Sequence, residues 1–145
     1  GMYPVSAVLA NDDIMLTIAP GEHGSTYGGS PMAASVAIAS LSVVRDEQLT
    51  RNAFEMGELF RNEIAKINNP MLLKVRGKGL LNAVVTRPME HKTAWDICLA
   101  LKENGLLAKP THGDIIRFTP PLIITKEQMM DSIAIIRKTL DAFGK

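Results

Sequence analysis

The apolar pattern of this chain changes near Arg45, and the change divides the sequence into two unequal parts. From residue 47 onward, stretches with helical periodicity alternate with short β-prone stretches, as in a domain that mixes helices and strands. Residues 1–46 contain one β-prone apolar stretch, at 4–10, which we expect to be a buried strand, and one Ala- and Ser-rich helical stretch, at 32–44. A single strand cannot form a sheet, because its backbone N–H and C=O groups need partners. We therefore predict a compact α+β domain over 47–145 and interpret 1–46 as the end of a larger domain.

The elements expected after residue 46 follow from periodicity and from stop signals. Apolar side chains recur at helical spacing between 47 and 67, and Asn68-Asn69-Pro70 ends this amphipathic pattern. Gly105 is expected to end a second helix, and Thr125 is expected to cap a third. The predicted helices cover 47–67, 92–104 and 125–143, and the predicted strands cover 71–76, 80–86, 106–109 and 115–118.

The composition excludes several classes of protein. With 145 residues, 46% of them hydrophobic and 21% charged, the chain is long and apolar enough to bury a core. The net charge is +1 and the basic residues are scattered, so we expect neither a nucleic-acid partner nor a membrane partner. The apolar runs are too short to span a bilayer. The single cysteine excludes an internal disulfide and fits a reducing compartment, so we expect an intracellular protein.

The segment from Pro20 to Pro31 combines four glycines with hydroxyl side chains and leads into a helix. Pro31 suits the first helical position, because its missing N–H would be unpaired there in any case. Glycines let backbone N–H groups approach a ligand, Ser25 and Thr26 offer hydroxyl donors, and a helix N-terminus favours negative charge. The segment is a candidate phosphate-binding loop. A flexible loop that merely precedes a helix is the alternative.

Arg117 stands between apolar residues of the predicted strand 115–118. A guanidinium group can bind a carboxylate through two parallel hydrogen bonds, which makes Arg117 a candidate anion-binding residue. The alternatives are a residue on a solvated strand face and a member of a structural ion pair.

Other residue types that often carry chemistry lack a supporting pattern. His23, His91 and His112 have no metal-ligand spacing, so we predict no metal site. Lys78 lies between two glycines, but the spacing predicts a β-turn between strands rather than a nucleotide-binding loop. Cys98 lies in an apolar helical stretch and is interpreted as a buried, inert thiol.

Four segments in the same order resemble the class III (subgroup II) pyridoxal-phosphate aminotransferases. They cover residues 3–9, 20–29, 75–83 and 104–118, so the resemblance extends over nearly the whole chain. The resemblance implies an α/β fragment of fold-type I: residues 1–46 would end the large cofactor-binding domain, and residues 47–145 would form the small C-terminal domain.

The resemblance also implies roles for the candidate residues. Ser25 and Thr26 would bind the phosphate of pyridoxal phosphate held by the neighbouring subunit of a homodimer. Arg117 would pair with a glutamate and release it to receive the carboxylate of a substrate, 2-oxoglutarate or glutamate. The implied reaction transfers the δ-amino group of ornithine to the 2-oxo acid, leaving glutamate semialdehyde and glutamate.

The lysine that forms the Schiff base with the cofactor is expected upstream of residue 1, because none of the nine lysines here stands in the matching context. We therefore assign no catalytic residue to this chain and expect it to be inactive alone. Ser30 stands where the family usually has Asn, and Ala19 where Lys is frequent. The alternatives are a fragment of an acetylornithine or 4-aminobutyrate aminotransferase and a non-catalytic module for dimerisation. The expected location is the cytoplasm or the mitochondrial matrix.

Overall fold

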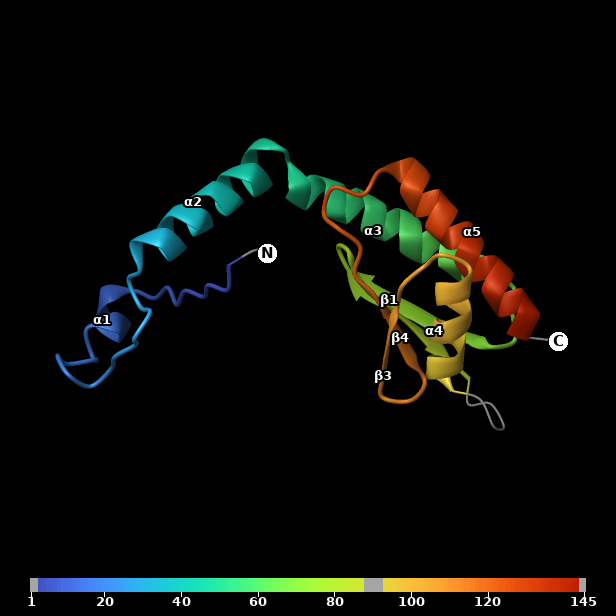
Figure 1. Cartoon of the computed structure of the whole chain (residues 1–145), viewed down its shortest axis with the longest axis horizontal. Helices are drawn as coiled ribbons and strands as arrows, with labels where there is room; N and C mark the ends of the chain where they lie inside the picture. The colour runs from blue at the N-terminus through green and yellow to red at the C-terminus, as the bar shows by residue number, and fades with distance from the viewer. Residues whose placement is uncertain (1–2, 88–92, 144–145) are drawn as a thin grey trace. The chain divides into compact units, whose positions relative to one another are not determined.

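The chain forms two compact units, Gly1–Glu47 and Gln48–Lys145. The structure is a computed structural model that describes residues 3–87 and 93–143 (Figure 1). The assignment of the first unit to a larger cofactor-binding domain stays a prediction. Among the described residues, no helix is both long and apolar enough to cross a bilayer.

The first unit contains two helices. Helix α1 covers Asp12–Met15, and Asn11 precedes it in an extended conformation. Helix α2 covers Pro31–Asp46, which confirms the prediction that Pro31 occupies the first helical position. No residue of α2 is buried. Its Ala- and Ser-rich surface is therefore available for packing against other protein.

The predicted buried strand at 4–10 is wrong. These residues form no regular element and are exposed, and they pair with no described strand. A strand is stable only when a neighbouring strand takes up its N–H and C=O groups. No such neighbour exists among the described residues, so the β-prone side chains of this segment have no sheet to join.

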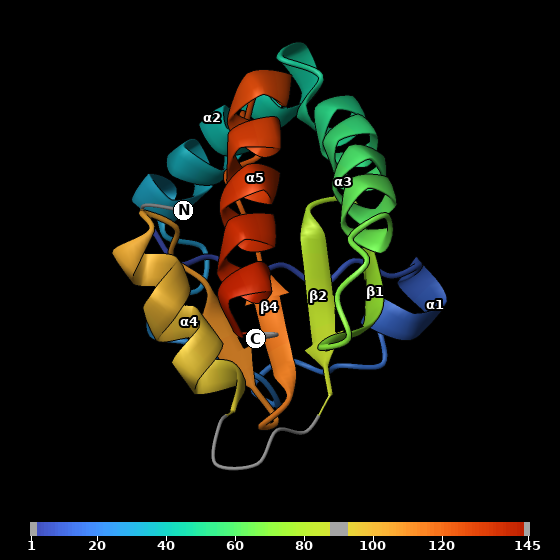
Figure 2. The same ribbon diagram turned by 90° about the vertical axis from the view of Figure 1, so that its right-hand side faces the viewer.

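The second unit is a four-stranded antiparallel sheet covered on one side by three helices. The strand order is β1-β2-β4-β3. Figure 2 shows α3, α5 and α4 on the same side of the sheet. The helices are α3 (Leu49–Ala65), α4 (Ala94–Glu103) and α5 (Lys126–Phe143), and the strands are β1 (Leu72–Lys78), β2 (Leu81–Thr86), β3 (Lys109–Thr111) and β4 (Ile115–Phe118).

The core lies between the sheet and the helices. Val84 of β2 pairs with Ile116 of β4, and both side chains are 1% exposed. The rings of Phe60 and Phe118 meet with centroids 5.4 Å apart, which joins α3 to β4. The other apolar side chains of this layer come from α4 and α5 and include Ile97, Leu101, Met129, Ile133, Ile136 and Leu140.

The ends of the helices follow local rules. Gly105 has a φ of +91° and its N–H bonds to Lys102, while the N–H of Leu106 bonds to Leu101, which completes a Schellman motif. This confirms Gly105 as the helix end. The motif takes up the N–H of Leu106, and β3 begins only at Lys109, so the predicted strand 106–109 was placed too early. The Thr125 cap is confirmed by its reciprocal hydrogen bonds with Gln128, of 3.0 and 3.2 Å.

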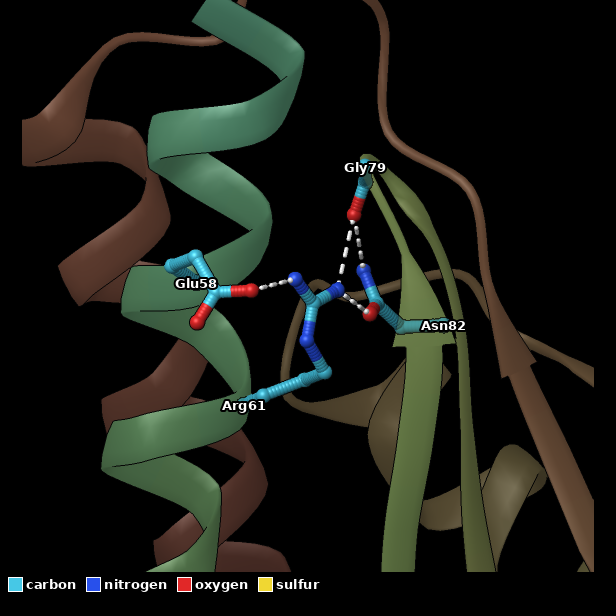
Figure 3. Close-up of polar contacts among 4 residues, drawn as sticks. All are labelled: Glu58, Arg61, Gly79 and Asn82. Atoms are coloured by element: carbon cyan, nitrogen blue, oxygen red, sulfur yellow. Dashed lines mark hydrogen bonds and ion pairs between the residues drawn. The ribbon is translucent and has the colours of Figure 1, made fainter.

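A polar junction holds α3 against the turn between β1 and β2. The Arg61 Nη1 donates to the Gly79 carbonyl at 3.0 Å and to Asn82 Oδ1 at 2.6 Å (Figure 3). Its Nη2 lies 2.5 Å from Glu58 Oε1. Asn82 is 2% exposed, and its Nδ2 also donates to Gly79. A side chain at Gly57 would collide with the Gly79 carbonyl, so glycine is required where helix and turn meet.

The Arg61→Met substitution tests this junction. It should lower the free energy of unfolding by about 2 kcal/mol, because Asn82 Oδ1 is left buried without its donor. Arg51→Met removes an exposed pair with Glu55 from the same helix and should change stability by less than about 0.5 kcal/mol. Urea denaturation of both variants gives the comparison. Equal losses of unfolding free energy in the two variants would show that the junction stabilises the fold no more than an exposed ion pair does.

Cys98 is confirmed as a buried thiol. It is 5% exposed, and burial raises its pKa to about 11. The thiol should therefore stay protonated and unreactive at pH 8, with a thiolate fraction about a hundredfold below that of the unfolded chain. Labelling with a thiol reagent should be slow in the native protein, fast in denaturant, and faster as the pH rises toward 11. Rapid stoichiometric labelling of the folded chain at pH 7 would contradict this.

Candidate functional site

The glycine-rich loop of the first unit is shaped by Ser25. The Gly28 N–H donates to Ser25 Oγ at 3.1 Å, and a Cβ at Gly28 would stand 3.0 Å from the Ser25 Cβ. The serine hydroxyl accepts this bond and keeps its own proton available for an outside acceptor. Thr26 follows it and is exposed. Gly21 and Gly29 have φ values of +90° and +73°, which an L-residue rarely adopts.

The loop leads directly into the start of α2. Ser30 is the N-cap residue and its side chain makes no capping bond, while Pro31 has no N–H. The N–H groups of Met32 and Ala33 precede the first intrahelical bond, which runs from Ala34 to Ser30 at 3.0 Å. A hollow of about 310 Å³ lies here, lined by residues of the loop, the start of α2 and residues 3–6. Donor hydroxyls, free N–H groups and the helix dipole together favour an anion.

Arg117 lies on β4, on the face of the sheet opposite the helices. It pairs across the backbone with Ala83 of β2 and with Lys109 of β3. Its side chain is exposed, and no carboxylate of the described part of the chain forms an ion pair with it. The role of Arg117 stays a prediction. The guanidinium donors are available to a carboxylate.

A hollow of about 490 Å³ opens beside Arg117. Apolar side chains form most of its wall, and Lys109 and Arg117 supply its cations. Such a hollow suits a ligand or polypeptide segment with an apolar part and a negative charge. The wall is made by residues 106–109 and 117–121 together with Phe60, Ile124, Met129 and Ser132.

Lys109 was not singled out from the sequence. It lies directly opposite Arg117 in the register of β3 and β4. The signal that could have found it is the pairing of the two predicted strands on either side of a short turn, since cross-strand partners share a face.

The remaining sequence predictions about chemistry can be compared with the structure. The turn between β1 and β2 is made by Gly79 and Leu80, and Lys78 is the last residue of β1, so the β-turn prediction holds with a shift of one position. No group of metal-ligating side chains exists within residues 3–87 and 93–143. His91 lies outside the described residues. Ser25 and Thr26 belong to the first unit and Arg117 to the second.

Comparison with known proteins places this geometry in a family. The sequence profile described as aminotransferase class III matches residues 1–140. Mitochondrial ornithine aminotransferase of Drosophila melanogaster is 61% identical over 140 residues, which are 97% of this chain and 32% of that protein. The rat mitochondrial ornithine aminotransferase is 56% identical over 143 residues, which are 99% of this chain and 33% of that protein. The chain thus spans about a third of the length of these curated relatives.

Solved structures give the same result. The ornithine aminotransferase of Plasmodium yoelii is 50% identical with a TM-score of 0.93, over 99% of this chain and 38% of that one. A structure titled acetylornithine aminotransferase, from Elizabethkingia anophelis, is 57% identical with a TM-score of 0.92, again over 99% of this chain and 38% of that one. A profile match over nearly the whole chain and relatives above 50% identity lead to one conclusion: this chain belongs to the class III aminotransferase family.

Proposed function

We propose that this chain is the C-terminal part of a pyridoxal-phosphate-dependent ornithine aminotransferase subunit. The reaction transfers the δ-amino group of ornithine to 2-oxoglutarate and yields glutamate semialdehyde and glutamate. The observation that carries the proposal is the 61% identity to the fly ornithine aminotransferase over 97% of the chain. The residues available for anion binding in each unit are of the kind that such a reaction needs.

The glycine-rich loop fits the phosphate of the cofactor. Ser25 keeps a hydroxyl proton to donate, Thr26 offers a second hydroxyl, and the first N–H groups of α2 add the positive end of a helix dipole. Pyridoxal phosphate, when bound, supplies the electron sink for amino transfer. The role proposed for this chain is to hold the phosphate of the cofactor that the neighbouring subunit of a homodimer carries.

Arg117 is proposed to bind the substrate carboxylate. Its exposed guanidinium is free of ion pairs within the described part of the chain, and two of its N–H groups can grip one carboxylate. A glutamate from the preceding part of the subunit would occupy Arg117 until the 2-oxo acid arrives. The proposed exchange orients the substrate and matches its negative charge.

A specific observation favours a second amino donor. The Elizabethkingia structure that is 57% identical to this chain is titled an acetylornithine aminotransferase. Ornithine and acetylornithine differ by an acetyl group on the α-nitrogen. Comparing the rates with the two amino donors therefore decides between ornithine aminotransferase and acetylornithine aminotransferase activity.

A chimeric enzyme tests the proposed function. Joining the part of the fly enzyme that precedes its matched 140 residues to this chain should give ornithine-dependent glutamate formation, measured by coupled assay. Ser25→Ala with Thr26→Val should weaken cofactor binding by about a hundredfold or more, because each removes a hydrogen bond to a charged group. Arg117→Ala should lower kcat/KM for 2-oxoglutarate by about a hundredfold, with a smaller loss for Arg117→Lys.

A control variant and two further outcomes of the chimera experiment decide whether the proposed function holds. Ser40→Ala removes an exposed hydroxyl of α2 away from the loop and serves as the matched control, with cofactor affinity unchanged. A folded chimera that accepts acetylornithine but not ornithine would support the alternative donor. A folded, cofactor-loaded chimera without transfer from either donor would refute the proposed function.

The isolated chain should not carry the cofactor covalently. Incubation with pyridoxal phosphate and reduction with borohydride should leave no stoichiometric adduct on any single lysine, because the nine lysines lack the context of the family's cofactor lysine. Intact-mass and peptide mass spectrometry measure this. A stoichiometric adduct at one lysine together with ornithine-dependent turnover would contradict it.

A further inference from the structure

Lys109 is the residue that the fold places directly opposite Arg117. Strand β3 is the outer strand next to β4, and its Lys109 pairs across the backbone with Arg117. The neighbouring pair is Pro110 and Ile116, and Ile116 is packed in the core beneath the helices with 1% exposure. Side chains alternate along a strand, so Lys109 and Arg117 both point to the face that the helices leave uncovered (Figure 2). Both side chains are exposed, and both residues line the hollow of about 490 Å³.

The two cations repel each other unless an anion lies between them. Residues directly opposite each other in an antiparallel pair have Cβ atoms about 5 Å apart, and like charges there are unfavourable. Neither Lys109 nor Arg117 forms an ion pair with a carboxylate within residues 3–87 and 93–143. Strands β3 and β4 contain no Asp or Glu. A ligand that brings negative charge to the pair therefore removes a repulsion in addition to making its own contacts.

Arg117 and Lys109 offer an anion two different contributions. A guanidinium group is a planar fork that fixes the orientation of one carboxylate. An ammonium group is a compact charge on a flexible stem, and it attracts an anion without fixing its geometry. The attraction between charges grows with the charge of the ligand. Lys109 should therefore strengthen the binding of a doubly negative ligand more than that of a singly negative one, while Arg117 sets the orientation.

We propose that Lys109 is a specificity-determining residue of the amino-acceptor site, where its ammonium group favours 2-oxo acids with two carboxylates over those with one. The inference rests on the proposed function, in which Arg117 binds the acceptor carboxylate. The amino donor ornithine carries a net positive charge and gains nothing from Lys109. A lysine on an outer strand also discourages pairing with other chains, but that structural role does not distinguish between ligands of different charge.

Lys109→Gln in the chimeric enzyme described above tests the inference. The kcat/KM for 2-oxoglutarate should fall about fivefold to tenfold, mainly through a higher KM. The kcat/KM for 2-oxopentanoate, which has the same carbon chain without the second carboxylate, should fall less than about twofold. The inhibition constant of glutarate, a doubly negative compound that cannot accept an amino group, should rise about as much as the KM for 2-oxoglutarate. Raising the salt to about 0.5 M should reduce these differences, because the charges are then screened.

Two further variants serve as controls. Lys109→Arg keeps the positive charge and should retain the acceptor selectivity to within about twofold. Lys74→Gln is the same substitution at an exposed position of the same sheet face, two strands and thus about 10 Å from β4. That distance exceeds the screening length of about 8 Å at physiological salt, so Lys74→Gln should change the selectivity less than about twofold. Circular dichroism checks folding, and Lys109→Thr, which suits a strand, replaces Lys109→Gln if the latter does not fold.

The outcomes separate this inference from the proposed function. A selective loss with 2-oxoglutarate that is absent in Lys109→Arg would support the inference. An active chimera in which Lys109→Gln lowers kcat/KM equally for both acceptors, or for neither, would overturn the inference and leave the proposed function standing. An equal change of selectivity in Lys74→Gln would also overturn it, because the effect would then come from net charge alone. A folded, cofactor-loaded chimera without transfer from either donor would overturn both.

Discussion

The contact between α3 and the turn of the β1–β2 hairpin is the constraint on which the second unit depends. Gly57 leaves room for the Gly79 carbonyl, and Arg61 then reaches both that carbonyl and the buried Asn82. Because Asn82 lies at the start of β2, the junction sets the position of the central hairpin relative to the helical layer (Figure 3). The buried amide of Asn82 keeps its hydrogen bonds in one packing arrangement only, since a displaced turn would leave the amide without partners.

The position of β2 then decides what each face of the sheet presents. Val84 faces the helices and pairs with Ile116, so the alternate residues Ala83 and Arg117 face the other way. The same register therefore buries Val84 and Ile116 and exposes Arg117. A shift of one residue in the register would exchange the two faces. The candidate substrate residue Arg117 owes its accessibility to a core contact on the opposite side of its own strand.

The first unit is organised by different means. Its described residues form no strand, and helix α2 buries none of its side chains. Its candidate site depends on short-range features: the Gly28 to Ser25 hydrogen bond, the positive φ of Gly29 and the open start of α2. Such a loop can be identified from sequence because its parts lie within a few residues. The prediction of a strand at 4–10 was wrong for the opposite reason, because strand formation requires a partner that local sequence does not specify.

The sequence by itself determined the local elements of this protein. The amphipathic α3, the Pro31 start, the Gly105 end and the Thr125 cap all depend on side chains within a turn or two, and all were predictable. Tertiary structure alone decided the strand order β1-β2-β4-β3, the later start of β3 and the alignment of Arg76, Arg117 and Lys109 in one row. The physical reason is that these residues are far apart in the chain, and only the packing of the hairpins against a shared helical layer brings their strands into register.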